Sequence, residues 1–358
     1  MAVHIMFTLK DFKLGGGIEC VQQRLAGQFL KDGQRVSFFV MNGETPDVAG
    51  ARILDGGGNG LLGLIKSIVL LRRIIRRESV THLISAKEQA NLCTWVATLG
   101  SRCQVIYTRH TALDCTEQKT GVHSLRLLYA LYLCGSGKVV AVSHGLHQTI
   151  ASLMPWGRER IRYCPNAVIT EQLHNASRAP LPKGLPHDYW IGVGRLVEVK
   201  GFHLLLQAYA LVIHNPDVPD LVIAGDGPLR EELIAQARQL GIANRVHFTG
   251  HLNNPYPLIR HARLLILSSF CEGQPTVLIE ALALGTPVLA SDCPTGPREL
   301  LDNGRLGQLV KVNDVPDLAQ ALQQSLSLKA RSARSMAHTV RPYTSEHAAR
   351  AYYEVWDQ

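Results

Sequence analysis

Residues 270–288 read FCEGQPTVLIEALALGTPV, and an apolar run, Leu264–Leu267, stands just before them. Pro275 suits the first turn of a helix, where no partner is needed for the N–H that proline lacks, and Gly285 suits a helix end. A second apolar run, Val288–Ala290, follows. The stretch therefore predicts a strand, a loop, a helix and another strand, the repeating unit of a parallel sheet covered by helices.

Two glutamates in this stretch are candidate binding groups. Glu272 lies in the loop that enters the helix, and Glu280 lies about a turn and a half inside it. Glu280 is flanked by leucine, isoleucine and alanine, so an ordinary solvated helix face fits it poorly. A carboxylate in the loop can reach a sugar hydroxyl, and one further inside can hold ribose hydroxyls. The first-turn amides of Thr276 and Val277 are free to bind phosphate.

The same alternation of short apolar runs and helical periodicity fills most of the chain. It predicts strands at Val3–Thr8, Arg35–Val40, Ala51–Leu54, His82–Ile84, Gln104–Tyr107, Val139–Val142, Arg160–Cys164, Trp190–Val193, Leu221–Ala224, Val246–Phe248, Leu264–Leu267, Val288–Ala290 and Gly307–Val310. It predicts helices at Ile18–Leu30, Leu62–Arg77, Gln89–Leu99, Ser124–Leu133, Gly145–Leu153, Phe202–His214, Leu229–Leu240, Pro255–His261, Pro275–Leu284 and Val315–Leu326. Residues 169–188 are polar and hold three prolines, as an interdomain linker would. We therefore expect an α/β protein with two doubly wound sheets that face a central cleft.

Length and composition agree with two folded domains. The 358 residues exceed what one core usually organises, and 46% of them are hydrophobic against 18% charged, which excludes extensive disorder. The formal charge of +8 favours an acidic partner: nucleic acid, an anionic membrane surface or a phosphorylated small molecule. No secretory signal or transmembrane helix is expected. The eight cysteines form no Cys-x2-Cys pair, so we expect reduced thiols in a cytosolic protein and no metal site.

Three further segments combine a strand end with glycine or a charge. Gly16 and Gly17 follow the first strand and open a helix, where backbone can approach an anion closely, although a plain turn explains them equally well. Arg195 and Lys200 share the turn after Gly194 and could grip a diphosphate, although solvated surface charges are the commoner explanation. Val197 stands where a dinucleotide-binding fingerprint has its third glycine, so the sequence supports an NAD site only weakly. His110 ends a strand, where side chains face the cleft in this fold class, although a lone histidine is more often structural.

Taken together, these motifs resemble the GT-B glycosyltransferases of family 4, which are retaining enzymes that use nucleotide sugars. The similarity rests on Glu272-x7-Glu280, on Gly194–Leu196 with Lys200-Gly201, and on the glycine loop Gly16–Glu19. Supporting matches run through Pro165–Val168, Ile223–Pro228, Val246–Gly250 and Asp292–Glu299. The resemblance covers nearly the whole chain, with the motifs in the expected order. Gln274 departs from the family pattern, in which an aromatic residue is common there, so the sugar preference stays open.

The resemblance implies a role for each site residue. Arg195 and Lys200 would neutralise the departing diphosphate, Glu280 would hold the ribose, and Glu272 would contact the donor sugar. His110, across the cleft, would lie near the sugar and the acceptor. Other donor-binding residues would be Gly16, Gly17, Gln274, Pro275, Thr276 and Val277. No Asp-x-Asp sequence is present. Two cations and a helix N-terminus could do the work of a metal, so metal-independent transfer without a cofactor is expected.

The resemblance also implies the domain plan: an acceptor-side domain at 1–168, the linker, a nucleotide-sugar-binding domain at 189–342, and a last helix at 343–358 that returns to the first domain. The expected function is transfer of a hexose or N-acetylhexosamine, from a nucleotide sugar that is UDP-linked by family habit, to a lipid-linked or lipopolysaccharide-type glycan. A UDP-sugar 2-epimerase of the same fold is the alternative. A nucleic-acid-binding module is a remote one, since no aromatic-rich basic stretch or zinc pattern supports it.

One helix carries a basic face that could meet an acidic surface. Its cations lie on roughly one arc, opposite Leu64, Ile68, Leu71, Ile74 and Ile75; they are Lys66, Arg72, Arg73, Arg76 and Arg77. A crossover helix with its charges in water is the plain explanation. Contact with anionic lipid is the other, and would place a cytoplasmic protein peripherally at the inner face of the membrane.

Overall fold

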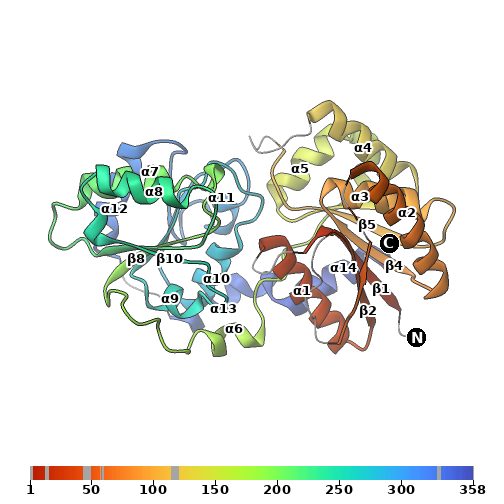
Figure 1. Ribbon diagram of the computed structural model, residues 1–358, viewed down its shortest axis with the longest axis horizontal. Helices are drawn as coiled ribbons and strands as arrows, with labels where there is room; N and C mark the ends of the chain where they lie inside the picture. The colour runs from red at the N-terminus through yellow and green to blue at the C-terminus, as the bar shows by residue number, and fades with distance from the viewer. Residues whose placement is uncertain are drawn as a thin grey trace. The chain divides into compact units, whose positions relative to one another are not determined.

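The computed structural model describes residues 3–12, 16–42, 50–56, 58, 60–113, 121–328 and 332–357. These residues divide into two compact units (Figure 1). Unit 1 takes the described residues up to 168, together with those from 343 onward, and unit 2 takes 169–342. Each unit is described by itself below.

Unit 1 is built on a seven-stranded sheet whose strands are all parallel, in the order β3-β2-β1-β4-β5-β6-β7. The strands are β1 (His4–Asp11), β2 (Arg35–Asn42), β3 (Arg52–Asp55), β4 (His82–Ala86), β5 (Gln104–Arg109), β6 (Lys138–Ala141) and β7 (Ile161–Tyr163). The central strands are almost continuously apolar because helices cover both faces of the sheet.

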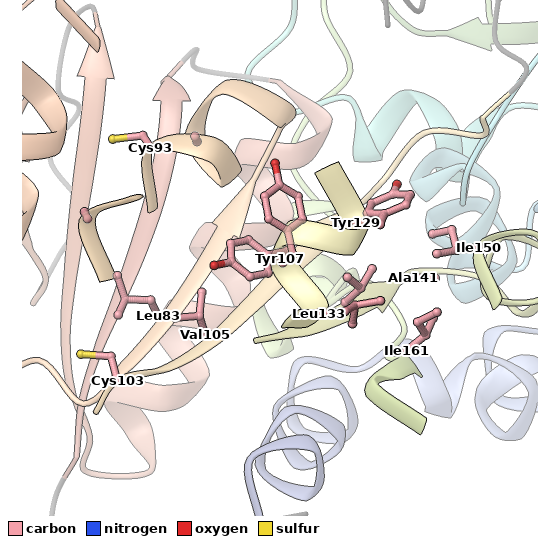
Figure 2. Close-up of a cluster of buried hydrophobic side chains, with 14 of the residues drawn as sticks. Leu83, Cys93, Cys103, Val105, Tyr107, Tyr129, Leu133, Ala141, Ile150 and Ile161 are labelled. Atoms are coloured by element: carbon pink, nitrogen blue, oxygen red, sulfur yellow. The ribbon is translucent and has the colours of Figure 1, made fainter. Parts of the chain in front are cut away.

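Two helices, α1 (Gly17–Lys31) and α14 (Ser345–Asp357), pack over one face of this sheet, with Phe29 against Trp356 at a ring-centroid distance of 5.7 Å. The helices that share the core on the other face are α2 (Gly60–Arg77), α3 (Glu88–Thr98), α4 (Val122–Cys134) and α5 (His144–Leu153). Figure 2 shows part of that second core, including Tyr107. The rings of Tyr107 and Tyr132 stack there with their centroids 4.2 Å apart. Successive side chains of each strand point to opposite faces of the sheet, so the strands contribute residues to two separate cores.

Unit 2 is built on a six-stranded parallel sheet in the order β10-β9-β8-β11-β12-β13. The strands are β8 (Tyr189–Val193), β9 (Asp220–Ala224), β10 (Val246–Gly250), β11 (Leu264–Leu267), β12 (Val288–Ser291) and β13 (Gln308–Val310). One group of helices, α7 (Phe202–Val212), α8 (Arg230–Gln239) and α12 (Val315–Ser325), shares a core with the sheet. A second group lies on the opposite face (Figure 1); it comprises α9 (Tyr256–His261), α10 (Thr276–Leu284) and α13 (Ala333–Val340).

The expected α/β fold with two doubly wound, parallel sheets is confirmed. Every expected strand and helix is present, with ends shifted by a few residues. Sequence periodicity missed α6 (Glu171–Ala176), α11 (Pro297–Leu300) and α13, because the first two are too short to show a helical period. The structure also contains short 3₁₀ helices at Pro155–Arg160, Glu198–Lys200, Ala243–Arg245 and Arg341–Tyr343.

The segment 169–188, expected as a linker, has structure of its own. It contains α6, and the amide of Asn254 donates a hydrogen bond of 2.9 Å to the carbonyl of Ala176 at the end of that helix. Its residues belong to unit 2. The polar composition of the segment indicated an exposed connection. It is equally compatible with a short surface helix that buries one side chain, Leu173.

Candidate functional site

The topology of unit 2 creates a place for a ligand between β8 and β11. These strands are neighbours in the sheet, but the chain leaves them toward opposite faces, into α7 after β8 and into α10 after β11. The two loops therefore diverge at the carboxyl ends of the strands, and open α/β sheets bind ligands at such switch points. Residues 194–201 form one loop and residues 268–275 the other.

Close backbone packing fixes the first loop. Gly225 has φ +150°, and a Cβ added there would lie 1.9 Å from the carbonyl oxygen of Gly194. Gly201 has φ +61°, and a Cβ there would lie 2.2 Å from the carbonyl oxygen of Ser268. The Ser268 hydroxyl in turn donates a 2.9 Å hydrogen bond to the carbonyl of Lys200. Glycine is required at both positions. The close approach at Gly201 brings the two loops together, and that at Gly225 holds the first loop against the end of β9.

An ion pair joins the loops at this point. Lys200 Nζ lies 2.7 Å from Glu272 Oε1, and the Ser269 hydroxyl donates to the same oxygen at 2.7 Å. The Glu272 side chain is 10% exposed and that of Lys200 26%, so the pair is mostly withdrawn from solvent. Thr295 also donates its hydroxyl to the carbonyl of Glu272. The structure thus brings together two residues that the sequence predicted separately, 72 positions apart.

Positive electrostatic character gathers beside this pair. Helix α10 begins after Pro275 with no side chain capping it, so the amides of its first turn, including Thr276 and Val277, lack partners within the helix. Both residues are half-buried, and Arg195 is exposed on the loop that holds Lys200. Gln274 is buried, at 5% exposure, just before the helix. Two cations and a helix N-terminus form an arrangement that favours a multiply charged anion.

Glu280 lies further inside α10 and is only 7% exposed. The hydroxyl of Tyr256, the first residue of α9, stands 3.5 Å from its Oε1. A buried carboxylate is stabilised by hydrogen-bond donors. The two carboxylate oxygens of Glu280 are therefore suited to accept hydrogen bonds from the hydroxyl groups of a bound molecule. Tyr256 was not among the residues that the sequence indicated, since nothing in its spacing connects it with α10.

Three sequence-predicted residues, His110, Gly16 and Gly17, lie in unit 1. His110 follows β5, and its Nε2 lies 3.0 Å from the hydroxyl of Thr108. Burial lowers the pKa of the His110 imidazole to about 4 despite a hydrogen bond with Asn166, so the ring is neutral near pH 7 and acts as a hydrogen-bonding group. At Gly17 an added Cβ would meet nothing within 4 Å, so the fold does not require glycine there. Gly16 caps α1 in an extended conformation.

A charged cluster near these residues was missed by sequence reasoning. Lys87 Nζ lies 2.6 Å from Asp11 Oδ1 and 2.8 Å from Glu19 Oε1, and its backbone has φ 73°. Burial alone would lower the pKa of Lys87, but the hydrogen bonds to both carboxylates raise it on balance. A lysine in this left-handed region is strained, which typically costs about 1–3 kcal/mol. The signal available in the sequence was Lys87 at the end of a strand, beside the glycine loop that contains Glu19.

We expect Lys87→Met to destabilise the protein by about 2–4 kcal/mol, because Glu19, with a side chain only 5% exposed, loses its cation. Urea unfolding would measure the change. The double variant Lys87→Met/Glu19→Gln should recover most of the loss, and Lys311→Met, at an exposed surface position, should change little. Equal losses in the single and double variants would contradict an electrostatic role for Lys87.

Unit 1 also contains a small polar cavity, and the arrangement of the described residues bears on whether a metal ion could bind. A cavity of about 180 Å³ at the carboxyl ends of β1 and β2 is lined by Lys10, Asn42 and Gln89, among others. Within the described residues, no three histidine, cysteine, aspartate or glutamate side chains gather so that they could hold a metal ion.

Solved structures define the class of protein to which this fold belongs. The chain superposes with a TM-score of 0.74 on the apo form of the lipopolysaccharide outer core galactosyltransferase WaaB, covering 99% of each chain at 20% identity. A sucrose-phosphate synthase from Thermosynechococcus elongatus gives a TM-score of 0.82 at 19% identity, covering 99% of this chain and 98% of that one. The fold is GT-B, two Rossmann-like domains.

Two family models match consecutive parts of the sequence. The model of Glycosyltransferase Family 4 matches residues 15–172, and that of Glycosyl transferases group 1 matches residues 175–341. The chain belongs to glycosyltransferase family 4, as its motifs suggested.

Two curated relatives are named as glycosyltransferases of lipopolysaccharide or lipid-linked glycan synthesis. It is 31% identical over 193 residues to the lipopolysaccharide core biosynthesis glycosyltransferase LpsE of Rhizobium meliloti, which is 54% of this chain and 55% of that protein. An N-acetylgalactosaminyltransferase of Campylobacter jejuni, whose name specifies a diphospho-undecaprenol substrate, is 27% identical over 229 residues, 63% of this chain and 61% of that protein. The chain thus spans little more than half the length of these relatives.

Proposed function

We propose that this protein is a retaining, metal-independent glycosyltransferase that moves a hexose or N-acetylhexosamine from a UDP-sugar to a lipid-linked or lipopolysaccharide-type glycan. The observation that carries the proposal is the Lys200–Glu272 pair, held at 2.7 Å at the switch point of unit 2 and next to the N-terminus of α10. It supplies a cation for a diphosphate and a carboxylate for sugar hydroxyls within one small region.

The donor's parts can be assigned by their chemistry. The diphosphate pairs with Lys200, Arg195 and the first amides of α10, because these groups carry the positive charge of the site. The ribose hydroxyls donate hydrogen bonds to buried Glu280. UDP as the nucleotide is supported by the Anabaena protein HepE, solved in complex with UDP, which matches this fold with a TM-score of 0.76 at 18% identity and covers 99% of this chain and all of that one.

Transfer breaks the bond between the sugar's anomeric carbon and the β-phosphate oxygen, and its electron pair stays on UDP. The acceptor hydroxyl forms a new bond to the same carbon and gives its proton to the departing phosphate oxygen. Lys200 and Arg195 stabilise the negative charge that develops on the diphosphate, which can replace a metal ion in this role. Attack on the face from which UDP leaves retains the anomeric configuration.

Glu272 contacts the donor sugar in this proposal and does not act as a nucleophile. Its Oε1 is already held by the Lys200 ammonium and the Ser269 hydroxyl, which stabilise it as a hydrogen-bonding carboxylate. Neutral His110 supplies a hydrogen bond to the sugar or acceptor from unit 1. Gly17 leaves room for a ligand at the start of α1, next to the N-cap residue Gly16, and both glycines are proposed to contact the donor.

A lipid-linked acceptor is supported by the printed substrate of the Campylobacter relative and by the lipopolysaccharide role of the Rhizobium one. None of the helices in the described part of the chain is both long and apolar enough to cross a bilayer. We propose that the protein works in the cytoplasm, at the inner face of the membrane where such acceptors are presented.

Release of UDP tests this function. We expect UDP release from UDP-glucose, UDP-galactose or their N-acetylated forms only when an undecaprenyl-diphosphate-linked sugar is added. The rate should survive EDTA, because the cations that stabilise the leaving group belong to the protein. UDP release or sugar isomerisation without any acceptor would instead identify an epimerase. Complete loss of activity in EDTA, restored by manganese, would overturn the assigned roles of Arg195 and Lys200.

A further inference from the structure

Helix α2 of unit 1 exposes large apolar side chains that the fold does not use. Leu61 is 74% exposed, Leu62 75%, Ile65 50% and Val69 55%. The helix is held to its domain by a different side, on which Gly63, Ser67, Leu71, Ile74 and Ile75 are buried. The four apolar residues therefore form a second apolar surface on the same helix, turned away from the core.

The basic residues of α2 share this outward face. Counted at about 100° per residue, the four apolar positions and Lys66, Arg72, Arg73, Arg76 and Arg77 all fall within an arc of about 160°. Along the helix axis, the first half of the face is mainly apolar and the second half entirely basic. The sequence indicated the basic residues but not the role of the apolar ones, because helical periodicity alone cannot tell which of two apolar sides of a helix is buried.

Within the residues that the structure describes, no acidic side chain pairs with this face. Helix α2 contains no aspartate or glutamate. In the described part of the chain, none of its five cations takes part in an ion pair. Glu78, which directly follows the helix, is engaged by Arg35 and Arg52 at 3.1 and 2.6 Å. The outward face thus presents five basic residues beside exposed apolar area.

We propose that the outward face of α2, defined as Leu61, Leu62, Ile65, Val69 and the five basic residues, docks on an anionic lipid bilayer. The apolar half enters the boundary between headgroups and acyl chains, and the arginine half pairs with lipid phosphates. A helix with this combination lies in the plane of the interface, since burial of apolar area and attraction to anionic lipid act together. The proposal deepens the proposed function, because a lipid-linked acceptor is presented at such a surface.

Vesicle sedimentation tests the docking without any transfer reaction. The full chain is expected to bind phosphatidylcholine vesicles that contain phosphatidylglycerol and to bind pure phosphatidylcholine much more weakly. Arg72→Gln/Arg73→Gln should weaken binding by about tenfold or more at low salt. Leu61→Gln/Leu62→Gln should weaken it by about tenfold or more, and the loss should persist at high salt, because apolar insertion is not screened.

Matched controls lie in unit 2. Leu211→Gln on α7, where the leucine is 57% exposed, and Arg238→Gln on α8 remove the same chemistry elsewhere and should leave vesicle binding unchanged. Binding of UDP, followed by calorimetry, should be equal in all variants, so failure of the donor site is distinguished from failure of docking. Wild-type binding by the α2 variants, or no preference for anionic vesicles, would overturn the proposal. So would a dimer that dissociates in Leu61→Gln/Leu62→Gln, since the face would then contact a second copy of the chain.

Discussion

Lys200→Ala is expected to lower turnover by about a hundredfold or more, the usual loss when a key electrostatic contact to a developing charge is removed. Two effects add in the same direction. The departing diphosphate loses a cation, and Glu272, with a side chain only 10% exposed, is left without the ammonium 2.7 Å away. An unpaired carboxylate would then lie beside a leaving group of the same charge. Steady-state release of UDP would measure the loss.

Arg195→Ala is expected to give a similar loss of turnover, because the departing diphosphate again loses a cation. Arg195 is exposed, so its removal should cost less thermal stability than removal of the half-buried Lys200. Arg238→Ala, an exposed cation on α8 of the same unit, serves as the matched control and should retain the wild-type rate. If both loop variants kept near-wild-type rates, Arg195 and Lys200 would be ordinary surface charges.

The two glutamates should fail in different ways. Glu280→Gln is expected mainly to raise the apparent KM for the donor, because Glu280 would hold the ribose, a part that does not react. Glu272→Gln is expected to lower kcat more than it weakens donor binding, because the sugar it contacts changes shape and charge in the transition state. In that variant Lys200 also loses its anionic partner, so binding of UDP alone should be kept or strengthened.

Kinetics on both glutamine variants, with NMR of the product, would measure this division. The wild-type product should keep the anomeric configuration of the donor. Identical defects in Glu272→Gln and Glu280→Gln would contradict the separate roles of the two carboxylates. An inverted product would contradict the retaining mechanism.

The sequence predicted the order of elements well because each depends on neighbours in the chain. Pro275 and Gly285 bracket α10, and the periodicity of residues 276–284 lies between them. Contacts such as Lys200 with Glu272 could not be predicted in this way, since they depend on β8 and β11 being neighbours in the sheet. The motifs identified both residues through their resemblance to a family, but only the fold explains why they meet.

Two other features were beyond the reach of sequence patterns. Lys87 adopts a positive φ that residue type alone argues against, and it is held there by Asp11 and Glu19 from two other elements. The outward side of α2 was hidden because apolar residues occur on both sides of that helix, and burial is decided by what the sheet contacts. In both cases the deciding partner lies far away in the sequence.

The place of α14 bears on how the chain matures during synthesis. The described residues of unit 2 form one segment, 169–342, whereas the core of unit 1 includes Ala348, Tyr352 and Trp356, which follow that segment in the sequence. During synthesis, unit 2 can therefore fold as soon as it leaves the ribosome. The face of the unit 1 sheet that α14 covers stays exposed until residues 345–357 have been made. Most of unit 1 is therefore synthesised before unit 2, yet its core is completed only after unit 2 has been made.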